Sequence, residues 1–132
     1  MPGYSGTPLA TKLGIKADSI VLPIGAPDNY RELLGDTGAT FAAKLTKSVS
    51  IVHLFTASKT ELAKVLKTYR DKLAPDAVVW VSWPKKASKV PTDITEDTIR
   101  TVALPMGWVD IKVCAVTEIW SGLKLVVRKS LR

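Results

Sequence analysis

The residues that could bind a ligand gather in short segments that follow apolar runs. Trp83-Pro84-Lys85-Lys86 places two cations directly after an aromatic ring, and Trp120 adds a second large ring further along the chain. Ammonium groups attract anions and indole rings cover flat apolar groups, so this combination indicates a site for an anionic or nucleotide-like small molecule. The alternative interpretation is that both tryptophans pack in the core and the lysines are solvated.

Two further segments belong to the same predicted site. The turn Gly25-Ala26-Pro27-Asp28 ends an apolar run, and Ser58 begins the clearest helical pattern in the chain. A helix N-terminus attracts negative charge, which suits the same class of ligand. The predicted ligand-binding residues are therefore Gly25, Pro27, Asp28, Ser58, Trp83, Lys85, Lys86 and Trp120.

No set of residues in the sequence indicates catalysis or a metal site. His53 is the only histidine and lies within an apolar run, which is typical of a hydrogen-bonded core residue. Cys114 is the only cysteine, and an inert buried thiol is favoured over a nucleophile. One histidine and one cysteine cannot complete a histidine-rich or thiolate zinc site. Asp93, Glu96 and Asp97 are better explained by the start of a helix than by an acidic site.

The hydrophobic pattern predicts the elements that would position these residues. Thr7 and Pro8 indicate a helix start, Asp28 indicates another, and Ser58 with Glu61 forms a capping box for the longest helix. Pro23 is expected to end or bulge the first strand, since it cannot donate to a ladder. The predicted helices cover residues 8–13, 28–34, 59–73 and 95–104, the last of them capped by Asp93 or Thr95, and the predicted strands cover residues 19–24, 40–45, 50–55, 77–83, 109–116 and 123–128.

The order of these elements predicts one α/β domain spanning residues 1–132. We expect a three-layer sandwich with a mostly parallel, Rossmann-like sheet of about six strands and a C-terminal antiparallel hairpin. Only residues 46–49 separate the strand at 40–45 from the next one, too few for a parallel crossover, so that strand is predicted to run antiparallel at an edge. The loops at 25–29, 56–59, 83–86 and 117–122 are expected to line one crevice.

Composition limits the class of protein. The chain has 132 residues and a net charge of +7, with 46% apolar and 23% charged residues. No apolar run reaches the ~20 residues that span a bilayer, and no secretory signal pattern begins the chain, so a cytoplasmic protein is expected. The basic charge could meet nucleic acid, but the interleaved aromatic and basic residues of single-strand binders are absent, which favours a solvated surface.

Two resemblances follow from particular segments. Lys12-Leu13-Gly14-Ile15-Lys16 before the glycine turn, and Gly107-Trp108 before the closing hairpin, resemble a class I methyltransferase domain. This resemblance implies S-adenosylmethionine over the glycine turn and an acid after the second strand that holds its ribose. The turn here has one glycine, and no Asp or Glu lies between Asp36 and Glu61.

The second resemblance is to a bacterial family of small single-domain proteins known only as a domain of unknown function. It rests on Gly3-Tyr4-Ser5-Gly6-Thr7-Pro8-Leu9, Trp83-Pro84-Lys85-Lys86, Pro91-Thr92-Asp93 and Trp120-Ser121-Gly122-Leu123-Lys124. It implies a bacterial source and no assigned activity. The segment at 3–6 could be a frayed end or a strip that lends Tyr4 to the crevice.

Three functions are consistent with these observations. The first is a non-catalytic ligand-binding or protein-interaction module on a reduced methyltransferase-like scaffold, favoured because no acid–base pair or nucleophile is present. The second is an S-adenosylmethionine-dependent methyltransferase with an altered glycine turn. The third is a nucleic-acid-binding protein, which requires the scattered lysines to gather on one face.

Overall fold

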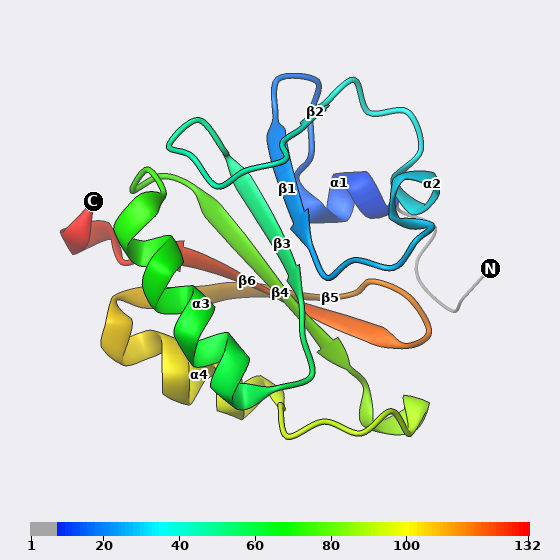
Figure 1. The fold of residues 1–132 in the computed structure, drawn as a ribbon, viewed down its shortest axis with the longest axis vertical. Helices are drawn as coiled ribbons and strands as arrows, with labels where there is room; N and C mark the ends of the chain where they lie inside the picture. Colours follow the sequence, from blue (N-terminus) through cyan, green and yellow to red (C-terminus); the bar gives the residue numbers. More distant parts are fainter. Residues whose placement is uncertain (1–7) are drawn as a thin grey trace.

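The computed structural model of the protein describes residues 8–132, and a mixed six-stranded sheet runs through its centre (Figure 1). The strands lie in the order β2-β1-β3-β4-β6-β5, with β1, β2, β3 and β4 parallel and β5 and β6 forming an antiparallel hairpin. Their bounds are Ile20–Ile24 for β1, Thr40–Phe41 for β2, Ile51–Phe55 for β3, Val78–Pro84 for β4, Trp108–Ala115 for β5 and Trp120–Val127 for β6. The predicted α/β fold with a mostly parallel sheet is confirmed.

Helices cover both faces of the sheet and bury two separate apolar clusters. Helices α1 (Leu9–Leu13) and α2 (Tyr30–Leu34) lie on one face, and α3 (Lys59–Lys72) and α4 (Glu96–Ala103) lie on the other (Figure 1). Trp80 is fully buried on the α1 face, where its indole N–H donates to the carbonyl of Leu13 at 3.0 Å. Trp108 is fully buried on the α3 face. No helix within residues 8–132 has the length and apolar character needed to cross a membrane.

The second strand differs from its prediction. It is an edge strand, as expected, but it has only two residues and runs parallel to β1, so the predicted antiparallel orientation is wrong. The prediction considered only the short link to β3, whereas β2 pairs with β1 and the intervening residues 25–39 supply the crossover. Because β2 is so short, residues 42–50 suffice to return the chain to the start of β3.

Pro23 neither ends nor bulges β1, contrary to the prediction. It stays in register opposite His53, and Ile24 continues the pairing with Leu54. The carbonyl of Val21 accepts from the amide of Ala42, so the alternate residues Val21 and Pro23 turn their backbone groups toward the β2 side. Since β2 pairs only with the first two residues of β1, the missing N–H of Pro23 has no strand partner to lose.

The starts of the two short helices also differ from their predictions. Pro8 occupies the N-cap of α1 rather than its first turn, and the predicted cap Thr7 lies outside the described residues, as does Tyr4. Asp28 does not cap α2, because the chain makes one more turn and places Asn29 at the N-cap without a side-chain hydrogen bond. The side chain of Asn29 is therefore left available to other groups.

A candidate adenosyl site at the carboxyl edge of the sheet

The carboxyl ends of β1, β3 and β4 meet at one edge of the sheet, because these strands are parallel (Figure 1). The turn of the β5–β6 hairpin reaches the same edge, since Trp120 lies opposite Pro84. The amide of Lys85 donates to the carbonyl of Ile119 at 2.7 Å and joins the loop after β4 to the hairpin. Ligands in open α/β sheets bind at this edge, so its hollows are the candidate sites.

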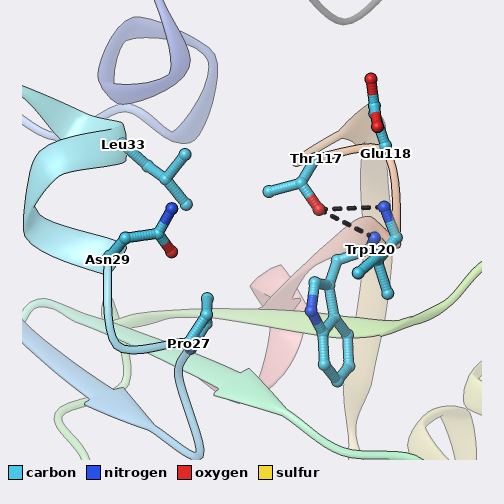
Figure 2. A pocket seen from close by; sticks show the side chains of 7 residues that line it. Pro27, Asn29, Leu33, Thr117, Glu118 and Trp120 are labelled. Atoms are coloured by element: carbon cyan, nitrogen blue, oxygen red, sulfur yellow. Dashed lines mark hydrogen bonds between the residues drawn. The ribbon is translucent and has the colours of Figure 1, made fainter.

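The first hollow lies between the β1–α2 turn and the hairpin. It has a volume of about 280 Å³ and is lined by Pro27, Asn29, Leu33 and residues 117–120. Figure 2 shows Asn29 and Leu33 directed from the α2 side toward the hairpin, with the ring of Trp120 between the hairpin and Pro27. The hollow therefore combines an aromatic ring and apolar walls with one carboxamide.

A ring contact and two hydrogen bonds hold the hairpin side of this hollow in place. The indole of Trp120 packs edge-on against Phe55, with ring centroids 5.1 Å apart. The hydroxyl of Thr117 accepts from the amides of Ile119 and Trp120 at 3.0 and 3.1 Å, which closes the hairpin turn (Figure 2). A rigid aromatic wall loses little entropy when a ligand stacks on it.

A buried chain of hydrogen bonds, called the relay below, links Tyr30 at the start of α2 to His53 and Ser82. The Tyr30 hydroxyl is 2.8 Å from Nδ1 of His53, and Nε2 of His53 is 2.7 Å from the Ser82 hydroxyl. His53 is 0% exposed, and burial lowers its pKa to about 3. The prediction of a hydrogen-bonded core histidine is confirmed. Because Tyr30 follows Asn29, the relay anchors the start of α2 to β3 and β4.

Gly25 is explained by packing rather than by a ligand. Its φ angle is +68°, a left-handed conformation, and a Cβ atom placed on it would lie 2.6 Å from the carbonyl oxygen of Phe55. The turn is thus pressed against the end of β3 where no side chain fits.

A second hollow lies beyond the end of β4, with a volume of about 540 Å³. Trp83, only 8% exposed, forms part of its wall together with Lys86. The loop above it is held by Ser88, whose hydroxyl donates to the Lys85 carbonyl at 2.6 Å. Other lining residues include Lys89, Val90, Pro91 and Thr92.

The two tryptophans do not share one crevice, so that part of the prediction is wrong. Trp83 packs with the core cluster under α3 and α4, whereas Trp120 packs with the cluster under α1 and α2. The predicted residues are consequently divided, with Pro27 and Trp120 at the first hollow and Trp83 and Lys86 at the second. Binding of a ligand by these residues stays a prediction.

Ser58 lies at neither hollow, and its helix end is already occupied. Its hydroxyl accepts from the amide of Glu61 at 3.2 Å, but the carboxylate of Glu61 accepts from Thr56 instead of completing the predicted capping box. The carboxylate of Asp93 accepts from the amide of Lys59 at 2.7 Å. Asp93 therefore supplies the negative charge that this N-terminus attracts, and the α4 cap is Thr95.

Arg100 and the acids around it have a structural role. Arg100 binds Asp110 at 2.8 Å and Asp97 at 3.1 Å and also pairs with Glu96, which agrees with a helix-end role for these acids. Cys114 is half-buried, and burial raises the pKa of its thiol. Within residues 8–132 no three His, Cys, Asp or Glu side chains gather as metal ligands.

Comparison with known proteins bears on the fold. No protein-family model matches the sequence, and no curated protein matches it. A proposed type 11 methyltransferase from Sulfolobus solfataricus superposes with a TM-score of 0.63 at 12% identity, over 92% of this chain and 90% of the other.

Two superposed structures contain the cofactor or its product. Aeropyrum pernix fibrillarin with bound S-adenosyl-L-methionine has a TM-score of 0.59 at 11% identity, over 95% of this chain and 71% of that one. The DhpI–SAH complex, where SAH is S-adenosylhomocysteine, has a TM-score of 0.60 at 11% identity, over 92% of this chain and 83% of that one. The chain has a class I methyltransferase-like fold.

Sequence reasoning missed several residues of the first hollow. Asn29 lies within the loop predicted at 25–29 but was not singled out as a ligand-binding residue, and Leu33, within the predicted helix 28–34, carries no motif. Thr117 was within the predicted hairpin loop, but its role in closing the turn depends on hydrogen bonds that no spacing indicates.

Proposed function

We propose that the chain binds S-adenosylmethionine at the first hollow and acts as a methyltransferase of reduced size. The observation that carries the proposal is an aromatic hollow beside the β1–α2 turn, at the carboxyl edge of a methyltransferase-like sheet. Because similarity at this level concerns the fold, the proposal depends on the chemistry of the hollow itself.

The residues present fit the adenosine part of this cofactor. The indole of Trp120 offers a face for a purine ring, and Pro27 and Leu33 supply apolar walls. The carboxamide of Asn29 both donates and accepts, which matches the edge of an adenine base. Glu118 adds a carboxylate that can accept hydrogen bonds from ribose hydroxyls, whereas Asp28 is exposed and is not among the lining residues.

S-adenosylmethionine supplies an electrophilic methyl group when bound. The chain's own contribution is to hold the adenosine part in place and keep the acceptor close, since orientation alone lowers a bimolecular barrier by several kcal/mol. Among the lining residues within 8–132, Glu118 is the only one with a titratable side chain, so we expect the site to act through positioning more than through acid–base groups.

Calorimetric titration and thermal unfolding test this proposal. Saturation with S-adenosylmethionine or S-adenosylhomocysteine at 100 times the dissociation constant is expected to add about 2.7 kcal/mol to the free energy of unfolding, or several degrees in melting temperature. Asn29→Ala should weaken binding roughly three- to tenfold through the lost hydrogen bond. Trp120→Ala should weaken it roughly fivefold or more through lost stacking.

The control is Asp71→Ala, which removes an exposed polar side chain from α3 on the other face of the sheet. Its affinity should equal that of the unsubstituted chain. The proposal fails if neither adenosyl compound binds, or if Asn29→Ala and Asp71→Ala behave alike.

One observation favours a second function, a non-catalytic ligand-binding or protein-interaction module. β2 ends at Phe41, and residues 42–50 after it contain no Asp or Glu. The carboxylate that the methyltransferase resemblance implies for the ribose is therefore absent there. Binding of an adenosyl compound without methyl transfer to any acceptor would support this module.

A further inference from the structure

The second hollow, beside the loop between β4 and α4, has no part in the proposed function. In Figure 1 this loop leaves the end of β4, passes along the carboxyl edge of the sheet and returns to the start of α4. The hollow has a volume of about 540 Å³, against about 280 Å³ for the first hollow. That volume lies in the range of binding sites for small organic molecules.

Hydrogen bonds hold this loop in place without a ligand. The hydroxyl of Thr92 donates to the carbonyl of Ala57 at 2.9 Å and accepts from the amide of Ile94 at 3.0 Å. Ile94 is itself buried in the core under α3 and α4. At the other end of the loop, the Lys85 amide is bonded to the Ile119 carbonyl. The hollow is therefore preformed, so a ligand does not bear the entropic cost of ordering the loop.

Much of the lining of this hollow is apolar. Trp83, Ile94 and Val90 contribute side chains, and Val90 is 40% exposed although it carries no polar group. Pro84 and Pro91 add rigid rings. Contact with an apolar ligand would remove this surface from water, whereas a bare inorganic anion would leave it hydrated.

Two lysines supply positive charge to the same hollow. Lys86 begins the short 3₁₀ helix η1 (Lys86–Ser88), Lys89 follows that helix, and both line the hollow, whereas Lys85 does not. Within residues 8–132 every ion pair involves Arg100, so neither lining lysine has a carboxylate partner there. Two neighbouring cations without counter-charges attract an anion from outside the chain.

The acidic residue in the lining limits where that anion can lie. The carboxylate of Glu96 pairs with Arg100, which it shares with Asp97 and Asp110, so its charge is only partly neutralised. We therefore expect the anionic group on the lysine side, away from the start of α4. The remaining repulsion favours one negative charge over the two of a phosphate ester.

Lys89 adopts a conformation that costs stability. Its φ angle is +61°, and it is the only non-glycine residue within residues 8–132 with a positive φ. It ends η1 in the left-handed conformation, where glycine avoids the clash that a side chain brings. A side chain kept in a strained conformation at the wall of a hollow indicates a role in binding.

We propose that the second hollow binds a small organic acid with a flat apolar body. Its carboxylate lies at the ammonium groups of Lys86 and Lys89, and its body packs on the apolar wall around Val90. The inference goes beyond the proposed function and does not depend on it, because the first hollow takes no part in it.

Amide chemical-shift titration with 2-naphthoate tests this inference, and 2-naphthamide is the uncharged ligand of the same shape. Naphthoate should cause saturable shifts in residues 83–96. Naphthamide should bind roughly five- to tenfold more weakly, since it lacks the two charge contacts. Inorganic phosphate at the same concentration should cause no saturable shifts there, because it has no apolar body.

Variants of the two lysines separate their contribution from that of net charge. Lys86→Gln combined with Lys89→Gln should weaken naphthoate binding roughly five- to tenfold and leave naphthamide binding unchanged. The matched control is Lys44→Gln combined with Lys47→Gln, which removes the same charge at the same spacing from exposed positions between β2 and β3. It should leave both affinities unchanged.

Lys89→Gly tests the strained position separately. It should weaken naphthoate binding without lowering the melting temperature, because it removes a cation and relieves the left-handed conformation. A lower melting temperature would show that Lys89 serves the fold, which contradicts the argument from strain.

Four results would overturn the inference. These are equal affinities for naphthoate and naphthamide, equal loss in the two double variants, naphthoate shifts concentrated in residues 25–33 and 117–122, and saturable shifts with phosphate alone. Since no adenosyl compound is present in these titrations, their outcome leaves the proposed function to its own test.

Discussion

Acidification from pH 7 to pH 4.5 is expected to lower the free energy of unfolding by on the order of 3 kcal/mol through His53 alone. Burial lowers the pKa of His53 to about 3 in the folded chain, from an ordinary value of 6.5. Between these pH values the unfolded chain binds a proton that the folded chain does not, so stability falls as pH falls. Well above pH 6.5 His53 is neutral in both states and its contribution is constant.

Urea unfolding at several pH values measures this effect, and His53→Gln is the matched variant. Because His53 is the only histidine, substitution removes imidazole titration from the chain altogether. The variant should be less stable at pH 7, since the contacts to Tyr30 and Ser82 change, but its stability should depend less on pH between 6.5 and 4.5. If the free energy of unfolding depended on pH equally in both proteins, His53 could not be buried and neutral in the folded chain.

Gly25→Ala is expected to lower the free energy of unfolding by about 2–4 kcal/mol. The new Cβ would lie 2.6 Å from the Phe55 carbonyl oxygen, a backbone atom that cannot rotate away, and the φ of +68° adds left-handed strain. The substitution would move the β1–α2 turn from β3 and disturb the first hollow. Loss of ligand binding in a Gly25 variant therefore could not be assigned to a direct ligand contact.

Gly14→Ala provides the comparison, again by urea unfolding. Gly14 has nearly the same conformation, with φ of +76°, but a Cβ there would meet no atom within 4 Å. It should lose only the cost of the left-handed conformation, about 1 kcal/mol. Equal losses at both glycines would show that the approach of the turn to Phe55 is not a tight one.

The sequence predicted best those features that depend on residues close together in the chain. The continuous apolar run of β4 is buried along nearly its whole length, and the closing hairpin and the core histidine are where the pattern placed them. The errors concern pairing between distant segments. The orientation of β2 depends on its choice of β1 as partner, and the N-terminus of α3 is capped by Asp93, which is 34 residues from its partner Lys59.

The sequence could predict the edge of the sheet at which the candidate residues lie. It could not predict that these residues are divided between two hollows. Parallel strands bring the loops to one edge, which the order of elements implied. Which face each tryptophan occupies depends on the register of β4 with β6, and that register places Trp120 opposite Pro84 and so on the face opposite Trp83. The register of β5 with β6, with its irregularity between Asp110 and Lys112, places Lys112 opposite Lys124.

Amide chemical-shift mapping with added S-adenosylhomocysteine shows both whether the ligand binds and where on the chain it binds. If the first hollow is the adenosyl site, we expect saturable shifts concentrated in residues 25–33 and 117–122, around Asn29 and Trp120, with little change in residues 84–96. Absence of shifts, or shifts confined to the second hollow beside Trp83, would contradict it.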